Sequence, residues 1–104
     1  MPFLTSFKKL RISDPAKSDL AGIGDYTQRQ WGTVQKRKYL DQIKDTFKSL
    51  TQTPGLGSPC DDISKDLRAH PVGKHVIFYR DTKTILEIVR VLHGSMDVEP
   101  LRKN

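Results

Sequence analysis

The side chains best suited to acid–base chemistry lie in one short stretch of the chain, residues 70–93. This stretch contains all three histidines, together with a tyrosine and arginines that could hold a negatively charged group. An acid–base site could be assembled there from His75, His93, Tyr79, Arg80 and Arg90.

Each of these side chains also has a structural explanation. His75 and Arg90 are expected to face each other across a hairpin, and Arg80 with Glu87 would form a diagonal cross-strand ion pair worth roughly 0.2–1 kcal/mol. His93 precedes a glycine at the end of a strand, and it is the histidine that we most suspect of a function. No nucleophile with a neighbouring base and no metal-ligand spacing accompanies them. The residues alone therefore favour a binding module, without metal or cofactor, over an enzyme.

The same stretch reads as a β-hairpin, because two runs rich in β-branched and aromatic residues, 76–79 and 85–92, flank the polar residues 81–84. A turn centred there places Arg80 opposite Ile85. Period-2 alternation then divides the side chains between two faces. One face carries His75, Ile77, Tyr79, Leu86, Ile88, Arg90 and Leu92. The other carries Lys74, Val76, Phe78, Arg80, Ile85, Glu87, Val89, Val91 and His93. We expect the face with Ile88 to pack on helices and a partner to cover part of the other.

Two helices precede the hairpin. Ser13 is a natural N-cap before Asp14 and Pro15, and Gly32 ends the first helix and begins the second, which should run from Thr33 to Leu50. Apolar residues recur every three or four positions and define one buried stripe per helix. The first stripe is Ala16, Leu20, Ile23, Thr27 and Trp31, and the second is Tyr39, Leu40, Ile43, Phe47 and Leu50.

Short strands complete the pattern. Residues 10–12, starting near Phe7, and residues 67–70 are strand candidates, while residues 51–59 form a loop. The order predicts an α+β domain spanning residues 1–104, with an N-terminal strand and an antiparallel two-helix hairpin packed on one face of a small, mainly antiparallel sheet. Residues 1–6 and 99–104 are expected to be loosely ordered.

Net charge, apolar runs and cysteine count limit the partners and the location that the chain could have. The net charge is +6, which favours acidic partners such as nucleic acid, a nucleic-acid enzyme complex or an acidic protein. No apolar run approaches the ~20 residues of a membrane span, and the single cysteine, Cys60, suits a reducing compartment, so a cytoplasmic location is expected. The cations of the second helix fit either a solvated face or a nucleic-acid footprint.

Four segments in order resemble the ParE toxins of the RelE/ParE superfamily. They are residues 25–27 with 31–32 (Asp-Tyr-Thr and Trp-Gly), 53–57 (Thr-Pro-Gly-Leu-Gly), 71–80 (Pro-Val-Gly-Lys-His-Val-Ile-Phe-Tyr-Arg) and 88–97 (Ile-Val-Arg-Val-Leu-His-Gly-Ser-Met-Asp). The resemblance extends from about Leu10 to Val98 and implies an α-helical hairpin on an antiparallel sheet.

The resemblance implies a toxin of a type II toxin–antitoxin system. In ParE toxins the implied activity is binding of DNA gyrase and stabilisation of cleaved DNA, with neutralisation by a ParD-like antitoxin. The alternative within the superfamily is a ribosome-dependent mRNA endonuclease of the RelE kind. Such nucleases usually carry an arginine three residues before the tyrosine of the first hairpin strand, where this chain has Val76. Direct contact with nucleic acid is then expected only within the gyrase–DNA complex.

Two sets of contact residues follow from these expectations. The target surface should lie on the open sheet face and the chain end, and it comprises Arg80, His93, Met96 and Asp97. The antitoxin surface should lie on the helical side, and it comprises Leu20, Tyr39, Lys36 and Lys44.

Overall fold

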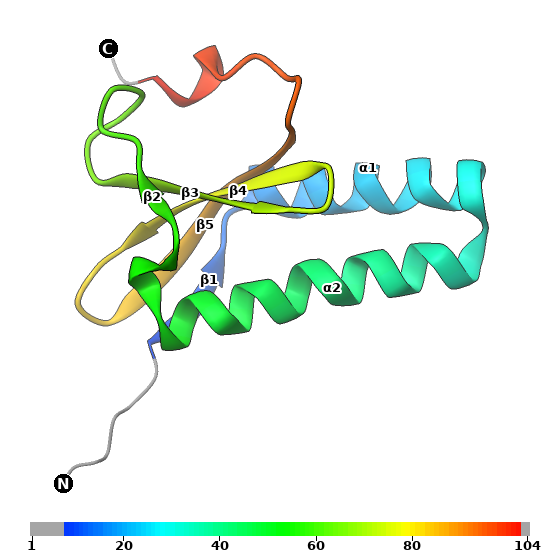
Figure 1. The fold of residues 1–104 in the computed structure, drawn as a ribbon, viewed down its shortest axis with the longest axis horizontal. Helices are drawn as coiled ribbons and strands as arrows, with labels where there is room; N and C mark the ends of the chain where they lie inside the picture. Colours follow the sequence, from blue (N-terminus) through cyan, green and yellow to red (C-terminus); the bar gives the residue numbers. More distant parts are fainter. Residues whose placement is uncertain (1–7, 103–104) are drawn as a thin grey trace, which may run out of the picture.

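The structure, a computed structural model, describes residues 8–102 and forms a five-stranded sheet with two long helices on one face (Figure 1). The sheet order is β1-β5-β4-β3-β2, with β1 parallel to β5 and every other pair antiparallel. This is the predicted α+β architecture, whereas Phe7 and residues 1–6 lie outside the described part. The elements are β1 (Lys9–Ile12), α1 (Asp14–Trp31), α2 (Thr33–Gln52), η1 (Pro54–Leu56), β2 (Ser58–Pro59), β3 (Leu67–Val72), β4 (His75–Asp81), β5 (Ile85–His93) and η2 (Glu99–Leu101).

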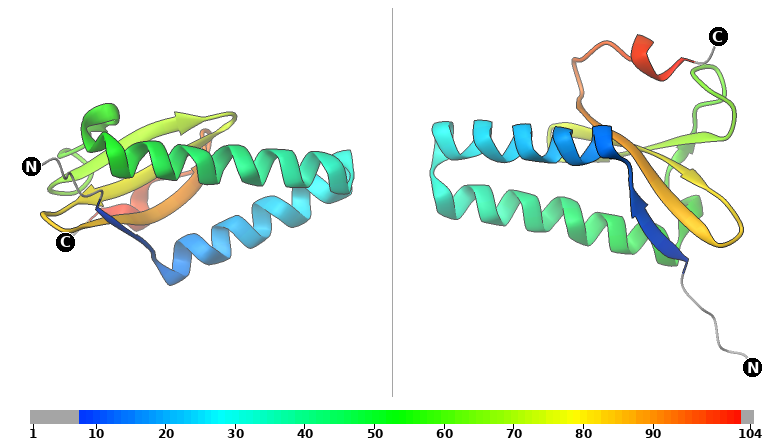
Figure 2. Two further views of the ribbon diagram at one scale, coloured as in Figure 1. Left: turned by 90° about the horizontal axis from the view of Figure 1, so that it is seen from below. Right: turned by 180° about the vertical axis from the view of Figure 1, so that it is seen from behind.

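The helical hairpin begins and turns where the sequence predicts. The Ser13 hydroxyl accepts a hydrogen bond from the Ala16 N–H at 3.1 Å, which caps α1. Gly32 alone separates the two helices and has φ +92°, a conformation that other residues rarely adopt. Gly24 lets α2 approach, because a Cβ there would lie 3.1 Å from Cε of Lys36. The two helices therefore run antiparallel and in close contact (Figure 2).

The main core lies between the helical hairpin and one face of the sheet. Its sheet side includes the predicted residues Ile77, Tyr79, Leu86 and Ile88, all with no exposed surface. The predicted orientation of the sheet is therefore confirmed. Its helical side consists of Ala16, Ile23, Ile43, Phe47 and Leu50, with Leu20 and Leu40 packed at its margin.

The predicted register of the hairpin is wrong by two residues. Arg80 pairs with Glu87 rather than Ile85, because Thr82 closes the turn through hydrogen bonds with the backbone of Ile85. A shift of two residues preserves side-chain alternation, so the faces remain correct as far as Ile88.

Beyond Ile88 a β-bulge reverses the two faces. Phe78 pairs with Arg90 and Tyr79 with Ile88, which leaves one extra residue in β5. As a result Val91 joins the main core and Leu92 lies on the opposite face, contrary to the prediction. The expected His75–Arg90 pair is also wrong, since the partner of His75 is His93.

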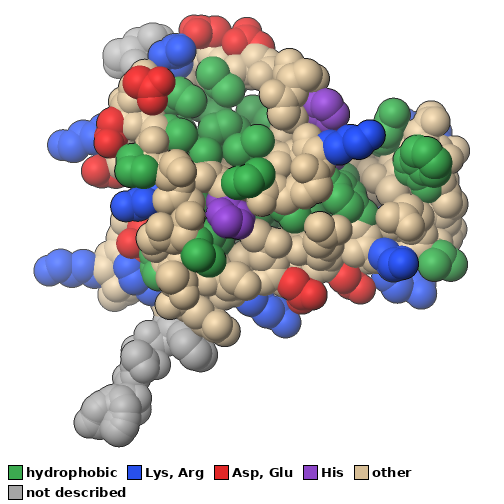
Figure 3. Space-filling view, viewed as in Figure 1, with side chains coloured by type: hydrophobic (Ala, Val, Ile, Leu, Met, Phe, Trp, Pro, Cys, Tyr) green, Lys and Arg blue, Asp and Glu red, His purple; other side chains and the backbone are tan. Residues whose placement is uncertain are grey.

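The second face of the sheet carries its own apolar cluster, so it is less open than expected. Leu67, Phe78, Leu92 and Leu101 are buried there, and the loop after β2 contributes Cys60 and Ile63. Figure 3 shows hydrophobic side chains gathered beneath the C-terminal segment. Loose order was expected for residues 99–104, but Glu99–Leu101 form a short 3-10 helix whose last residue is buried, and only 103–104 lie outside the described part.

Trp31 is not part of the buried stripe as predicted. Its exposed fraction is 70%, because the linked ends of α1 and α2 project beyond the sheet, so that no strand lies under the last turn of α1 (Figures 1 and 2). Among the described residues, no helix is sufficiently long and apolar to span a membrane.

Candidate binding groove

An apolar groove of about 880 Å³ lies between the flank of α1, the turn that joins β3 to β4 and the segment after β5. Ile23 and Val91 from the main core contribute to its apolar surface, and Tyr26, Trp31 and Met96 line it while remaining largely exposed. A groove of this size and character suits an apolar side of a peptide or helix. The remaining lining residues are Ser18, Asp19, Gly22, Thr27, Gln35, Tyr39, Gly73, Lys74, His75 and His93.

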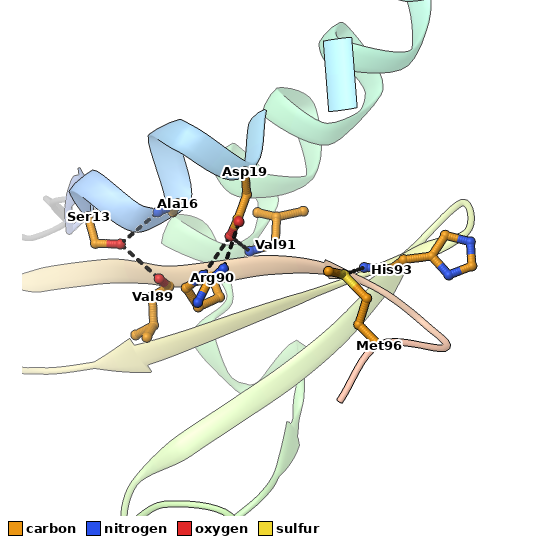
Figure 4. A network of polar contacts seen from close by, with 8 residues as sticks. All are labelled: Ser13, Ala16, Asp19, Val89, Arg90, Val91, His93 and Met96. Carbon is orange, nitrogen blue, oxygen red and sulfur yellow. Dashed lines mark hydrogen bonds and ion pairs between the residues drawn. The ribbon is translucent and has the colours of Figure 1, made fainter. Parts of the chain in front are cut away.

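Asp19 fixes the wall of the groove to the sheet (Figure 4). Its carboxylate accepts hydrogen bonds from Nε and Nη2 of Arg90 at 2.8 and 2.9 Å, and from the Val91 N–H at 2.9 Å. The Ser13 hydroxyl donates to the Val89 carbonyl at 2.8 Å one step earlier along β5. The hydrogen bonds that Arg90 donates to Asp19 raise the pKa of Arg90. Two side chains from the start of α1 therefore hold the bulged part of β5.

Tyr39, His75 and His93 form the polar end of the groove. The Tyr39 hydroxyl is 2.6 Å from Nδ1 of His75 and accepts from the Lys74 N–H at 3.2 Å. The rings of His75 and His93 meet edge to face, with centroids 5.4 Å apart. Burial lowers the pKa of His75, His93 lowers it further, and Asp19 opposes both effects. This environment favours a neutral His75 that positions its neighbours.

A tight turn after β5 places Met96 on the groove. The Met96 N–H donates to the His93 carbonyl at 2.9 Å, and the His93 N–H donates to Sδ of Met96 at 3.3 Å. Nδ1 of His93 accepts from the Ser95 N–H at 3.1 Å. One nitrogen of His93 is thus engaged in the turn itself.

The groove offers binding more readily than bond cleavage. Its one carboxylate, that of Asp19, is already engaged by Arg90 and Val91, so it is not available to orient a histidine as a catalytic base. Burial also raises the pKa of Tyr39, which keeps this hydroxyl neutral. Within residues 8–102, no group of three or more histidine, cysteine, aspartate or glutamate side chains could hold a metal ion.

The predicted target residues do not form one surface. His93 and Met96 line the groove, and Asp97 follows them in an exposed position where its carboxylate accepts from the Glu99 N–H at 3.0 Å. Arg80 lies near the other end of the hairpin, where its Nη2 donates to the hydroxyl of the buried Ser64 at 2.5 Å. The expected ion pair of Arg80 with Glu87 is absent from the described part of the chain, since Glu87 pairs with Arg11 at 3.6 Å.

The predicted antitoxin residues are similarly divided. Tyr39 lines the groove, whereas Leu20 packs against the main core. Lys36 bridges the helices through a 3.1 Å hydrogen bond from its Nζ to Oε1 of Gln28, and Lys44 is exposed further along α2.

Sequence reasoning missed most of the groove residues, Tyr26, Trp31 and Gln35 among them. Tyr26 lies outside the 3–4 stripe of α1, and Trp31 was placed in the core by that stripe. The available signal was the absence of any acidic residue between Asp25 and Asp41, next to a tryptophan at a helix end. Such a segment is typical of a surface that meets a partner.

Comparisons with known proteins agree with the fold. The family model described as ParE toxin of type II toxin-antitoxin system, parDE, matches residues 10–98. Toxin ParE1 of Caulobacter vibrioides is 37% identical over 90 residues, which cover 86% of this chain and 93% of that protein. Toxin ParE1 of Mycobacterium tuberculosis is 35% identical over 89 residues, with 85% and 91% covered.

Two solved structures share the fold. A chain of the chromosomal ParDE TA system from P. aeruginosa has a TM-score of 0.73 and 19% identity, covering 84% of this chain and 96% of that one. A chain of the toxin–antitoxin complex RelBE2 from Mycobacterium tuberculosis has a TM-score of 0.65 and 18% identity, covering 85% and 99%. The protein therefore belongs to the ParE toxin family of type II toxin–antitoxin systems.

Proposed function

We propose that this ParE-family toxin acts on DNA gyrase, blocks replication by stabilising cleaved DNA, and performs no chemistry of its own. In this proposal it acts in the cytoplasm and is held inactive by a ParD-like antitoxin. The family match over residues 10–98 and the curated relatives named ParE1 support a gyrase target over the ribosome, the target that RelE-like nucleases would use.

The single observation that carries the proposal is the state of the sheet arginines. A nuclease needs a cation available for the scissile phosphate. Arg68 donates to the Gly57 carbonyl at 2.6 Å, Arg80 donates to Ser64, and Arg90 is engaged by Asp19. Val76, at the position where the nucleases usually carry arginine, is half-buried against the second apolar cluster. Arg68, Arg80 and Arg90 thus support the fold, and the exposed Arg11 on β1 pairs with Glu87, which favours a toxin that works by binding.

We propose that the antitoxin binds in the groove. An amphipathic segment could place apolar side chains against Ile23, Val91 and Tyr26, while acidic groups meet Lys74 at the rim. The solved neighbours from P. aeruginosa and Mycobacterium tuberculosis are toxin–antitoxin systems, which supports a partner of this kind.

Pulse labelling after induced expression tests the proposed target. New DNA and new protein are labelled separately at early times, and a transcript with an early stop codon serves as the control. We expect DNA synthesis to fall before protein synthesis, and co-expression of the antitoxin to restore both. Loss of protein synthesis first, with cut mRNA, would overturn the proposal in favour of the RelE-like nuclease.

A further inference from the structure

The turn end of the helical hairpin, residues 26–40, is the most basic part of the described chain. This segment, the hairpin tip, contains Arg29, Lys36, Arg37 and Lys38 and no aspartate or glutamate. The four ion pairs of the described residues all lie elsewhere. The tip therefore carries four of the six net charges of the chain without a neutralising partner.

The remainder of α2 also carries lysines on a solvated face, but acidic residues balance their charge. Residues 41–52 contain Lys44 and Lys48, but Asp41 and Asp45 alternate with them at helical spacing, so this half is neutral. The hairpin tip lacks that compensation. Figure 3 shows basic and hydrophobic side chains at this end of the molecule and no acidic ones on the visible face.

The hairpin tip also exposes apolar side chains. Trp31 is 70% exposed and Val34 is 72% exposed, on either side of Gly32. An exposed aromatic ring in a segment rich in arginine and lysine is a combination that suits a nucleic acid, because the ring can stack on a base while the cations contact phosphates.

Polar side chains of the hairpin tip also contact one another. Lys36 packs across Gly24 and donates to Gln28, whose side-chain amide reaches the Thr33 hydroxyl at 3.5 Å. These contacts join the end of α1 to the start of α2.

We propose that the hairpin tip is a DNA-contacting surface, in which Arg29, Arg37 and Lys38 contact phosphates and Trp31 stacks on an unpaired base. The choice of DNA rests on the proposed function, since a gyrase poison that stabilises cleaved DNA acts where the duplex is broken and bases are accessible. In this arrangement the antitoxin binds in the groove and DNA binds the cations of the hairpin tip, and the two surfaces meet at Trp31, which lines the groove.

The first test uses the one tryptophan of the chain as the reporter. Titration with a short single strand of DNA should quench the fluorescence of Trp31, and the affinity should fall as salt rises, with a logarithmic slope of about −0.7 for each phosphate neutralised. Anisotropy of the same strand with a fluorescent label gives the affinity independently. Trp31→Ala should weaken binding by about fivefold or more. Absence of quenching at low salt would overturn the proposal.

A matched pair of variants separates this surface from overall charge. Arg37→Gln/Lys38→Gln and Lys48→Gln/Lys65→Gln each remove two positive charges at exposed positions. We expect the first to lower the salt slope by about 1.4 and the second to leave it nearly unchanged. Equal losses in both variants would show that binding reflects net charge alone, which contradicts a surface at the tip.

Two further measurements distinguish DNA from RNA and from the antitoxin as the ligand of the hairpin tip. A single strand of RNA with the same sequence that binds more tightly than DNA would overturn the assignment to DNA. An Arg37→Gln/Lys38→Gln protein that loses affinity for antitoxin but keeps its affinity for DNA would make the tip a protein-binding surface instead. A wild-type protein that binds DNA through Trp31 without affecting gyrase would leave this inference intact and remove the proposed target.

Discussion

The sheet-side half of the molecule and the hairpin tip differ in almost every physical respect. The sheet has an apolar cluster on each face, and the ion pairs of the described chain lie on it or next to it. The hairpin tip has exposed apolar side chains and cations without acidic neighbours. Buried and paired groups stabilise the fold. Exposed apolar groups and unpaired charges add little to folding stability, and they contribute mainly when they bind a partner. Stability and recognition should therefore be separable by mutation.

The largest effect on stability should come from the main core. Ile88 lies on β5 and is fully buried against the helices, so Ile88→Ala should lower the free energy of unfolding by about 2–5 kcal/mol. Trp31→Ala at the hairpin tip should change it by no more than about 0.5 kcal/mol. Urea denaturation of both proteins checks the contrast, and similar losses in the two would remove the distinction between the regions.

The next effect should come from the attachment of α1 to β5. Asp19→Asn weakens two hydrogen bonds that Asp19 accepts from Arg90 and one that it accepts from Val91, and it should cost about 1.5–3 kcal/mol of unfolding free energy. Asp25→Asn removes the same charge from an exposed site of the same helix and should be nearly neutral. Thermal unfolding of the two variants decides this prediction; a stable Asp19→Asn protein would show that the network positions side chains without holding the fold.

A smaller effect is expected for the C-terminal segment. Leu101→Ala removes the residue that covers the second cluster, and it should cost about 2 kcal/mol because the site is near the surface and can partly close. Met96→Ala, in the same segment but 55% exposed, should leave stability unchanged. Removing everything after Gly94 would therefore confuse lost stability with lost binding, and these point variants avoid that. If Leu101→Ala left the free energy of unfolding unchanged, the C-terminal segment would contact the sheet without stabilising the fold.

The smallest effect should be a pH dependence at His75. Burial and His93 depress its pKa in the folded state, with Asp19 opposing, so the unfolded chain binds the proton more readily. Stability from this group is complete above the unfolded pKa of about 6.5 and falls as the pH drops below it. His75→Gln should flatten that part of the profile of unfolding free energy against pH. Parallel profiles for the two proteins would contradict a depressed pKa.

Local patterns were sufficient to predict the helices and the orientation of the sheet. The 3–4 spacing of Ile43, Phe47 and Leu50, and the cap at Ser13, are properties of short segments, and the structure confirms them. The face that carries Ile77 and Ile88 was also correct, because alternation tolerates a register error of two residues.

Nonlocal contacts were responsible for the errors. The bulge after Ile88 is held by Ser13 and Asp19, more than 70 positions earlier in the chain. The local sequence around Val89 therefore does not predict the bulge. The exposure of Trp31 depends on how far the helices project beyond the sheet, and helical periodicity carries no such information. For the same reason the groove, which combines α1 with a turn and the segment after β5, could not be assembled from the sequence.

The central claim is that this chain poisons gyrase by binding, and purified components test it most directly. Gyrase, ATP and supercoiled DNA are incubated with increasing amounts of the protein, and covalently cleaved DNA is measured after denaturation. We predict that cleaved DNA accumulates with the wild-type chain, that antitoxin abolishes the effect, and that Arg37→Gln/Lys38→Gln reduces it more than Lys48→Gln/Lys65→Gln. Unchanged gyrase activity, together with mRNA cleavage by the same preparation on translating ribosomes, would contradict the account.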